Sequence, residues 1–310
     1  MAIVGPTAVG KSDLALRIAG RRSAEIVSAD SRQVYRGLEI GTAKPTLDEQ
    51  RRVAHHLIDV VDPGDDFSLA EFQERAYRAI DQILGRGHLP LLVGGTGLYV
   101  RAVVDGVQLP RVAPDPTLRR ELEAFARERG ADTLHHRLAD LDPRAASRID
   151  ARNLRRVVRA IEVVEKSGRL FSDFQGRQPR YDVLTIGLAR SRDDLYRRID
   201  QRVDRQIEDG LIEETRRVIE AGCSPERPAL AGLGYREIAA YLGGTLDLGS
   251  AIERIKFETH RFARQQANWF RLNDPLINWL DAGATNLEAS LALIDRRCGR
   301  DLNLAMEASG

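Results

Sequence analysis

The eight residues GPTAVGKS, Gly5 to Ser12, constrain the fold more than any other stretch of this sequence. Their spacing matches G-x-x-x-x-G-K-[ST], a pattern in which backbone N–H groups of a loop converge on an anion. Residues 2–4 before it are apolar, as at the end of a buried strand, and residues 14–18 carry apolar side chains at helical spacing. This strand–loop–helix order predicts a phosphate-binding loop, or P-loop, made of Gly5, Pro6, Thr7, Ala8, Val9, Gly10, Lys11 and Ser12.

Two side chains of this loop indicate the chemistry of its ligand. Lys11 would place a positive charge against the outer phosphate oxygens, and the hydroxyl of Ser12 is a suitable ligand for Mg²⁺. We therefore expect Mg²⁺ as a cofactor, bound through Ser12. The loop alone does not separate a kinase from an NTPase or from another enzyme that uses a phosphate group.

Further strand-like and helix-like segments alternate along the chain. Ser68 and Glu71 have the spacing of a capping box before a helix of about 17 residues. The alternation predicts an α/β fold, a P-loop NTPase-like core whose parallel sheet is flanked by helices. Because ligands of such sheets gather at the carboxyl ends of the strands, the P-loop, Asp30 and Gly94–Thr96 should meet at one site. The expected strands after the first are residues 24–29, 91–93, 182–189 and 277–280.

Between the strands expected at residues 91–93 and 182–189 the character of the chain changes. Residues 114–181 have a helical, arginine-rich pattern without buried-strand runs, which predicts an all-helical subdomain inserted into the core. The core domain would then comprise residues 1–113 and 182–310.

Composition and residue spacing bear on the partners, metal sites and cellular location to be expected. A net charge of +1 neither favours nor excludes a nucleic-acid partner, because a local basic patch can exist in a neutral total. The two cysteines, Cys223 and Cys298, lie far apart, so a zinc site or a disulfide framework is not expected. The paired histidines at 55–56 and 135–136 lack ligands at metal-binding spacing and are interpreted as structural. No apolar run approaches about 18 residues, so we expect a cytoplasmic protein with no membrane contact. We also expect a monomer.

Three residues outside the loop are candidates for chemistry. Asp30 ends a strand and could bind Mg²⁺ through water or accept a proton from a substrate. Thr96 lies in a glycine-rich turn and could orient a phosphate or a base, or be an ordinary turn residue. Arg202 could reach a diphosphate as a bidentate donor, although intrahelical pairs with neighbouring aspartates are an alternative.

A second set of arginines lies in the helical insertion. Arg155, Arg156 and Arg159 share one edge of a helix with the sequence LRRVVRAIEVVE. This edge suits a phosphate backbone, but a solvated face with an arginine paired to Glu162 fits the same pattern.

Taken together, the motifs resemble those of the tRNA dimethylallyltransferases, also called tRNA isopentenyltransferases. SADSRQVYRGLEIGTAKP and GGTGLY are more specific than the P-loop, and the matches span nearly the whole chain. No cysteine–histidine zinc module of the kind that eukaryotic members carry is present, so the chain resembles the bacterial form. The matching segments are GPTAVGKS, IVSADSRQVYRGLEIGTAKP, HHLIDVVDP, PLLVGGTGLYV, RVVRAIEV, GLGYREI and FARQQANWFR.

The resemblance implies an activity and roles for residues. The P-loop would hold the diphosphate of dimethylallyl diphosphate with Mg²⁺, and the dimethylallyl group would pass to N6 of the adenine 3′ of the anticodon. Asp30 would be the general base, Arg202 would stabilise the departing diphosphate, and Thr96 would contact the target nucleotide. The helical insertion would grip the anticodon stem–loop. The residues that the resemblance implies for tRNA contact are Asp30, Ser31, Arg32, Gln33, Thr96, Arg119, Arg155, Arg156, Arg159, Gly234, Tyr235 and Arg236.

Other functions remain open at this stage. A relative that prenylates free AMP, ADP or ATP would share the fold, but it would need no arginine-rich insertion. A kinase that binds ATP at the P-loop would leave the SADSRQVYRG block without a role. A P-loop RNA-binding module would bind tRNA whether or not Asp30 is present.

Overall fold

The structure, a computed structural model, describes residues 1–174, 176–282 and 286–307, with side chains up to residue 297. It divides into two compact units. The core unit contains Met1–Val104 and the chain from Tyr181 onward, and the helical unit is Asp105–Arg180. The helical unit therefore begins earlier in the chain than residue 114, where the helical pattern starts.

The core unit is built on one six-stranded sheet. All of its neighbouring strand pairs are parallel, and the strand order is β3-β2-β4-β1-β5-β6. This confirms the predicted parallel sheet flanked by helices. The strands are β1 (Ala2–Val4), β2 (Ala24–Ser28), β3 (His55–His56), β4 (Leu89–Val93), β5 (Thr185–Ala189) and β6 (Ile277–Asp281).

Both faces of the central strands β1, β4 and β5 are buried, which explains why these strands are nearly continuous apolar runs. Along β1, Ile3 faces one hydrophobic cluster with α1, whereas Ala2 and Val4 face a second cluster with α3 and α4. This period of two places helices on each side of the sheet. The helices of the core unit are α1 (Lys11–Ala19), α2 (Leu47–Arg52), α3 (Leu69–Gly85), α4 (Gly97–Val104), α9 (Arg192–Glu208), α10 (Leu211–Glu220), α11 (Tyr235–Leu242), α12 (Leu248–Gln266) and α13 (Asn286–Glu307).

Helix α3 has the predicted 17 residues and begins after Ser68, as predicted, but the predicted capping box is incomplete. The Ser68 hydroxyl accepts the N–H of Glu71, whereas no reciprocal bond from the Glu71 side chain is made, so this is a simple N-cap. Glu71 instead pairs with Arg75 one turn along the helix. A complete capping box occurs at α2, between Thr46 and Glu49.

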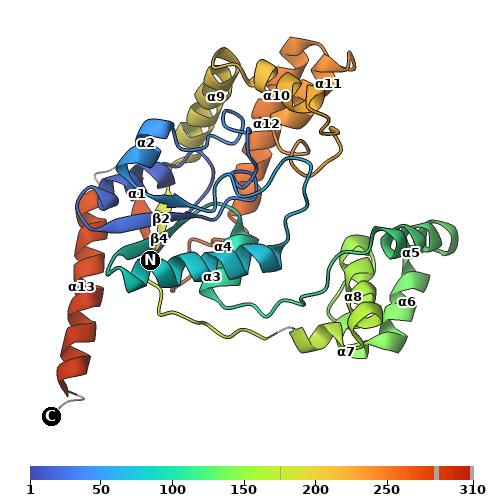
Figure 1. Cartoon of the computed structure of the whole chain (residues 1–310), viewed down its shortest axis with the longest axis horizontal. Helices are drawn as coiled ribbons and strands as arrows, with labels where there is room; N and C mark the ends of the chain where they lie inside the picture. Colours follow the sequence, from blue (N-terminus) through green and yellow to red (C-terminus); the bar gives the residue numbers. More distant parts are fainter. Residues whose placement is uncertain (175, 283–285, 308–310) are drawn as a thin grey trace. The chain divides into compact units, whose positions relative to one another are not determined.

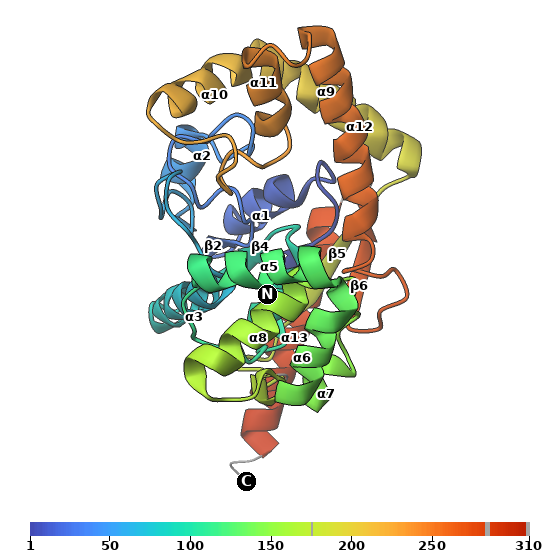
Figure 2. The same cartoon turned by 90° about the vertical axis from the view of Figure 1, so that its right-hand side faces the viewer.

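Helices α9 to α12 gather at one end of the core unit, as Figures 1 and 2 show. α12 packs against both α9 and α11, and α10 packs against α11. This group lies across the P-loop, because side chains from α9 and α12 reach that loop directly.

The helical unit has its own hydrophobic core, formed by residues such as Leu122, Leu134, Leu138 and Ile161. An antiparallel bridge between Val107 and Arg177 joins its two ends. Its helices are α5 (Pro116–Arg129), α6 (Ala131–Leu141), α7 (Pro143–Ala146) and α8 (Leu154–Ser167), followed by a 3₁₀ turn, η1 (Phe171–Phe174).

Candidate active site

The P-loop joins β1 to α1 in a conformation that its glycines permit. Gly5 and Gly10 have φ angles of 142° and 111°, which favour glycine, and Ala8 lies in the left-handed region at 61°. A Cβ on Gly5 would come within 2.6 Å of the carbonyl oxygen of Leu188 in β5. Gly10 is the N-cap of α1 and provides no side chain to cap it, so the first N–H groups of the helix are left for an anion.

Lys11, the first residue of α1, is turned back over this loop. Its ammonium group donates to the carbonyls of Gly5 at 3.0 Å and Pro6 at 2.7 Å. Burial lowers the pKa of Lys11 to about 8, an effect that Asp30 opposes and Arg202 reinforces. An anion bound in the loop would favour the charged form of Lys11, so binding and protonation are coupled here.

The loop is also held by side chains from distant parts of the chain. Gln266 at the end of α12 accepts the N–H of Thr7 at 2.8 Å. Three arginines donate to successive loop residues: Arg202 to the Thr7 hydroxyl at 3.4 Å, Arg198 to the Ala8 carbonyl at 3.1 Å and Arg190 to the Val9 carbonyl at 3.0 Å. The predicted contribution of Arg202 to this site is therefore compatible with its position, and burial lowers its pKa.

Asp30 follows β2 directly and lies beside the loop. Its Oδ1 accepts the backbone N–H of Arg32 at 2.8 Å and, more weakly, that of Gln33 at 3.4 Å. Within the part of the chain that the structure describes, Oδ2 has no hydrogen-bond partner. The carboxylate is thus fixed in orientation by one oxygen, and the other oxygen is available to a substrate.

The turn after β4 meets the turn after β2. Gly94 approaches Ala29 so closely that a Cβ there would lie 2.2 Å from the Ala29 carbonyl oxygen. Thr96 accepts the N–H of Ser31 through its hydroxyl oxygen at 3.3 Å. The three strand ends singled out in the sequence are therefore adjacent in space.

These strand ends line one large cavity of about 1300 Å³ in the core unit. Apolar side chains such as Leu16, Ile40 and Ile199 line it together with the polar ones. A cavity of this kind, with a few convergent polar groups, is where a small ligand binds. The predicted site residues that line it are Thr7, Ala8, Gly10, Lys11, Ser12, Asp30, Ser31, Arg32, Gln33, Thr96, Arg202, Tyr235 and Arg236.

Glu214 anchors the segment that follows Asp30, and sequence reasoning did not find it. Its carboxylate is 2 % exposed and accepts three successive backbone N–H groups, those of residues 39–41, at 2.9 to 3.2 Å. The Tyr235 hydroxyl donates to the same carboxylate at 2.6 Å, and burial raises the pKa of Tyr235. Tyr235 is therefore a support for this segment, and of the predicted Gly234–Arg236 contact only Arg236 has an exposed side chain.

The predicted arginines of the helical unit fall into two groups. Arg119 and Arg159 both bond the carboxylate of Glu162, which is fully buried. Burial works to raise the pKa of Glu162, but the hydrogen bonds from Arg119, the Asp115 N–H and Arg159 outweigh it and lower the pKa. Arg155 and Arg156 are exposed, at the first turn of α8.

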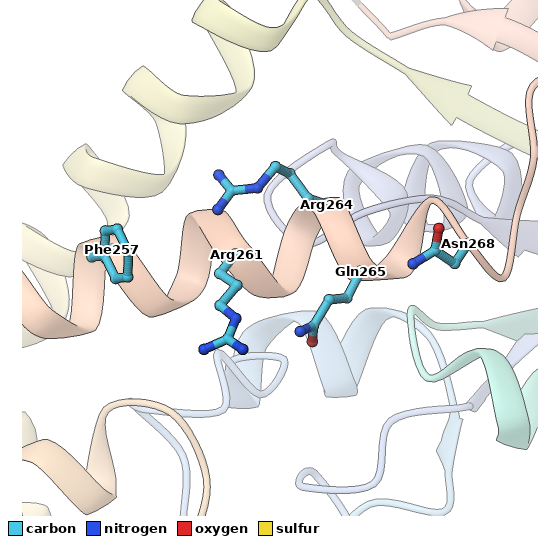
Figure 3. Close-up of a pocket in the computed structure, with 5 residues that line it drawn as sticks. All are labelled: Phe257, Arg261, Arg264, Gln265 and Asn268. Atoms are coloured by element: carbon cyan, nitrogen blue, oxygen red, sulfur yellow. The ribbon is translucent and has the colours of Figure 1, made fainter. Parts of the chain in front are cut away.

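A second, smaller pocket of about 580 Å³ lies along α12. Figure 3 shows its lining residues, which come from this helix except for Asn268 just beyond its end, with Arg264 on one side and Arg261 and Gln265 on the other. The Arg264 guanidinium donates to the Tyr196 hydroxyl on α9 at 2.6 Å. An exposed Phe257 adds an apolar surface to this basic face.

The paired histidines have structural partners. His56 bonds the carboxylate of Glu25 at 2.7 Å, and His135 bonds the carbonyls of Ala146 and Ile149. Among the residues that the structure describes, no three His, Cys, Asp or Glu side chains are placed to hold a metal. Ser12 does line the cavity, and a hydroxyl beside phosphate oxygens is a donor set that Mg²⁺ accepts. No helix among the described residues is long and apolar enough to cross a membrane.

A P-loop at the carboxyl edge of a parallel sheet, facing a strand-end carboxylate, defines an enzyme that acts on a phosphate-bearing substrate. Comparison with known proteins identifies the class further. A model of the IPP transferase family matches residues 33–273, and one of the isopentenyl transferases matches residues 1–59. The chain belongs to the IPP transferase family, whose members are prenyltransferases.

Relatives in sequence and structure agree with this assignment. The tRNA dimethylallyltransferase of Thermomicrobium roseum is 51 % identical over 91 % of this chain and 85 % of its own length. The tRNA dimethylallyltransferase of Roseiflexus sp. is 50 % identical over 96 % of this chain and 97 % of its own length. The full-length tRNA isopentenylpyrophosphate transferase of Bacillus halodurans superposes with a TM-score of 0.71 at 40 % identity, covering 99 % of this chain and 98 % of its own. A eukaryotic dimethylallyltransferase acting on tRNA superposes with a TM-score of 0.79 at 27 % identity, covering 97 % of this chain and 79 % of its own.

Proposed function

We propose that this cavity is where the chain transfers the dimethylallyl group of dimethylallyl diphosphate to N6 of the adenine 3′ of the anticodon in tRNA. The observation that carries the proposal is the meeting of the P-loop with Asp30 and Thr96 in one cavity. The P-loop supplies an anion site, and the other two residues supply a proton acceptor and a hydroxyl next to it.

The diphosphate end of the substrate binds at the P-loop. The first N–H groups of α1, the Lys11 ammonium and the Arg202 guanidinium all lie on the side of the cavity where negative charge develops as diphosphate leaves. Mg²⁺, held through the Ser12 hydroxyl and the phosphate oxygens, would add Lewis-acid stabilisation. Burial around Lys11 and Arg202 strengthens these interactions because water screens them less.

At the other end, Asp30 acts as the general base. The N6 nitrogen attacks C1 of the dimethylallyl group, the C1–O bond breaks, and the diphosphate leaves with the electron pair. The N6 proton passes to Oδ2 of Asp30, while the N–H groups of Arg32 and Gln33 hold Oδ1. Thr96 orients the base, and the adenine must leave the stack of the anticodon loop to reach this position.

Contacts to tRNA come from both units. In the core unit we assign them to residues 30–33, Thr96 and Arg236. In the helical unit, exposed Arg155 and Arg156 contact the anticodon stem–loop directly, while Arg119 and Arg159 lie on the same unit and are held by Glu162. The basic and aromatic face of α12 suits a phosphate backbone as well. We place this activity in the cytoplasm, in a monomeric protein.

A competition between acceptors tests this function. Purified protein would receive Mg²⁺ and labelled dimethylallyl diphosphate, with either unmodified tRNA that has an adenine-rich anticodon loop, or a mixture of AMP, ADP and ATP. We expect label on tRNA alone. Label on free nucleotides alone would assign the chain to the nucleotide-prenylating branch of the fold, and hydrolysis of ATP without prenyl transfer would favour a kinase or an NTPase.

A further inference from the structure

Gln266 is a buried side chain that joins two loops of the active site. It is the last residue of α12 and only 4 % exposed. Its Oε1 accepts the N–H of Thr7 in the P-loop at 2.8 Å, and its Nε2 donates to the carbonyl of Gly95 at 2.9 Å. One amide group thus spans the phosphate-binding loop and the turn that carries Thr96.

The close packing around this amide leaves little freedom for either loop. A Cβ on Gly95 would come within 2.3 Å of the Gln266 Nε2 and within 3.4 Å of both the Gly5 carbonyl oxygen and the Lys11 ammonium. A glycine is therefore required where the turn approaches the glutamine. Only one orientation of the amide satisfies both contacts, because Thr7 offers a donor and Gly95 an acceptor.

We infer that Gln266 is a positioning residue that fixes the spacing between the P-loop and the Gly95–Thr96 turn. The inference rests on the proposed function, in which these loops hold the diphosphate and the adenine. The distance between the leaving group and the attacking nitrogen would then depend on one side chain at the wall of the cavity, which bonds both loops. The N–H of Thr7 is used in this contact, so the anion is bound by N–H groups later in the loop and in the first turn of α1.

Two variants, whose side chains are nearly the same size as glutamine, distinguish the contributions of the two hydrogen bonds. Gln266→Glu keeps the acceptor for Thr7, but a carboxylate oxygen would face the Gly95 carbonyl instead of a donor. When protonated, that carboxyl group can donate to Gly95 again, so its effect should depend on pH. Gln266→Met removes both bonds and leaves a partly buried N–H and a buried carbonyl unpaired at every pH.

The experiment measures kcat/KM for transfer to tRNA between pH 5.5 and pH 8.5, as the ratio of each variant to the wild-type protein. The charged groups facing this region, Lys11, Asp30 and Arg202, are present in all of these proteins, so the ratio isolates the change at position 266. Thermal unfolding and binding of inorganic pyrophosphate are followed in parallel. Gln82→Glu, an exposed change of the same type on α3, is the control.

We expect Gln266→Met to lose about ten- to a hundredfold in kcat/KM at all pH values. Gln266→Glu should lose a similar factor at pH 8 and recover about tenfold relative to the wild-type protein as the pH falls to 6. Gln82→Glu should stay within about twofold of the wild-type protein across the range. A constant ratio for Gln266→Glu, or near-normal transfer by Gln266→Met, would overturn the role of Gln266.

If neither variant folds, Gly95→Ala tests the same contact from the other side, since its methyl group would displace the amide. Normal transfer by that variant would overturn the inference. The assay of the wild-type protein distinguishes failure of the proposed function from failure of this inference. If the wild-type protein does not transfer the group to tRNA, the proposed function is contradicted. If it does, and the pH profiles of Gln266→Glu and the wild-type protein are parallel, only the role of Gln266 is contradicted.

Discussion

Arginine serves different purposes in the two units. In the core unit, Arg190, Arg198 and Arg202 donate to the backbone or hydroxyl of the P-loop, so their positions are set by the loop itself. In the helical unit, Arg155 and Arg156 are exposed at the first turn of α8. Arginines that are held in place favour catalysis, because they need little reorganisation when charge develops in the reaction. Exposed arginines favour binding of a charged polymer such as RNA. Substitutions in the two units should therefore affect different quantities.

The largest expected effect belongs to the core unit. Asp30→Asn should lower the rate of transfer about 10²- to 10⁴-fold, because an amide cannot take the N6 proton while the shape of the site is kept. Binding of tRNA should change little. Single-turnover transfer and a filter-binding titration measure the two quantities separately. Asp48→Asn, on the exposed side of α2, is a matched control. Near-normal turnover by Asp30→Asn would remove this carboxylate from the mechanism.

The second effect concerns stability and belongs to the helical unit. Glu162→Ala would leave Arg119 and Arg159 without the fully buried carboxylate that they share. We expect a loss of about 2–4 kcal/mol in the free energy of unfolding of this unit, less than for a wholly buried pair because both arginines are partly exposed. Hydrogen exchange of the full chain should show faster exchange in α5 and α8.

The matched control for this prediction is on the same helix. Glu165→Ala removes a more exposed carboxylate paired with Arg137 and should cost no more than about 1 kcal/mol. Exchange in the core unit, including the P-loop, should stay unchanged in both variants. If Glu162→Ala were as stable as Glu165→Ala, the buried carboxylate would not hold the unit together.

The sequence predicts the parts of this molecule that local patterns encode. The P-loop, the parallel sheet and the adjacency of Asp30 and Thr96 follow from short motifs at strand ends. Gln266 and Glu214 were not predicted as site residues because their contacts join residues 259 and 175 positions apart. A glutamine or glutamate in an amphipathic helix carries no local sign of such a partner. The capping box predicted at Ser68 was wrong for a different, local reason, since Glu71 pairs with Arg75 four residues along the helix instead.

A third prediction concerns pH in the core unit. Burial lowers the pKa of Lys11 to about 8, so above that pH the free protein loses this positive charge. Affinity for inorganic pyrophosphate with Mg²⁺ should therefore fall by up to about tenfold per pH unit above pH 8, because a proton must be taken up on binding. Isothermal titration from pH 7 to 9.5 measures this.

Lys11→Arg is the control, because arginine stays charged over the whole range and pyrophosphate titrates identically with both proteins. The affinity of the wild-type protein relative to this variant should decline above pH 8. A flat ratio would mean that Lys11 remains charged in the free protein and that its contacts with the Gly5 and Pro6 carbonyls outweigh burial.

The smallest expected effect is a loss of tRNA affinity when the exposed arginines of the helical unit are removed. Arg155→Ala with Arg156→Ala should weaken tRNA binding several-fold and reduce the slope of log K against log salt by about 1.4 to 1.8, one phosphate contact per arginine. The rate of transfer at saturating tRNA should stay near normal. Arg152→Ala with Arg169→Ala, two arginines of the same unit outside the predicted set, controls for net charge. An equal loss of slope in the control would mean that the unit attracts tRNA through its total charge, and that α8 provides no particular contact.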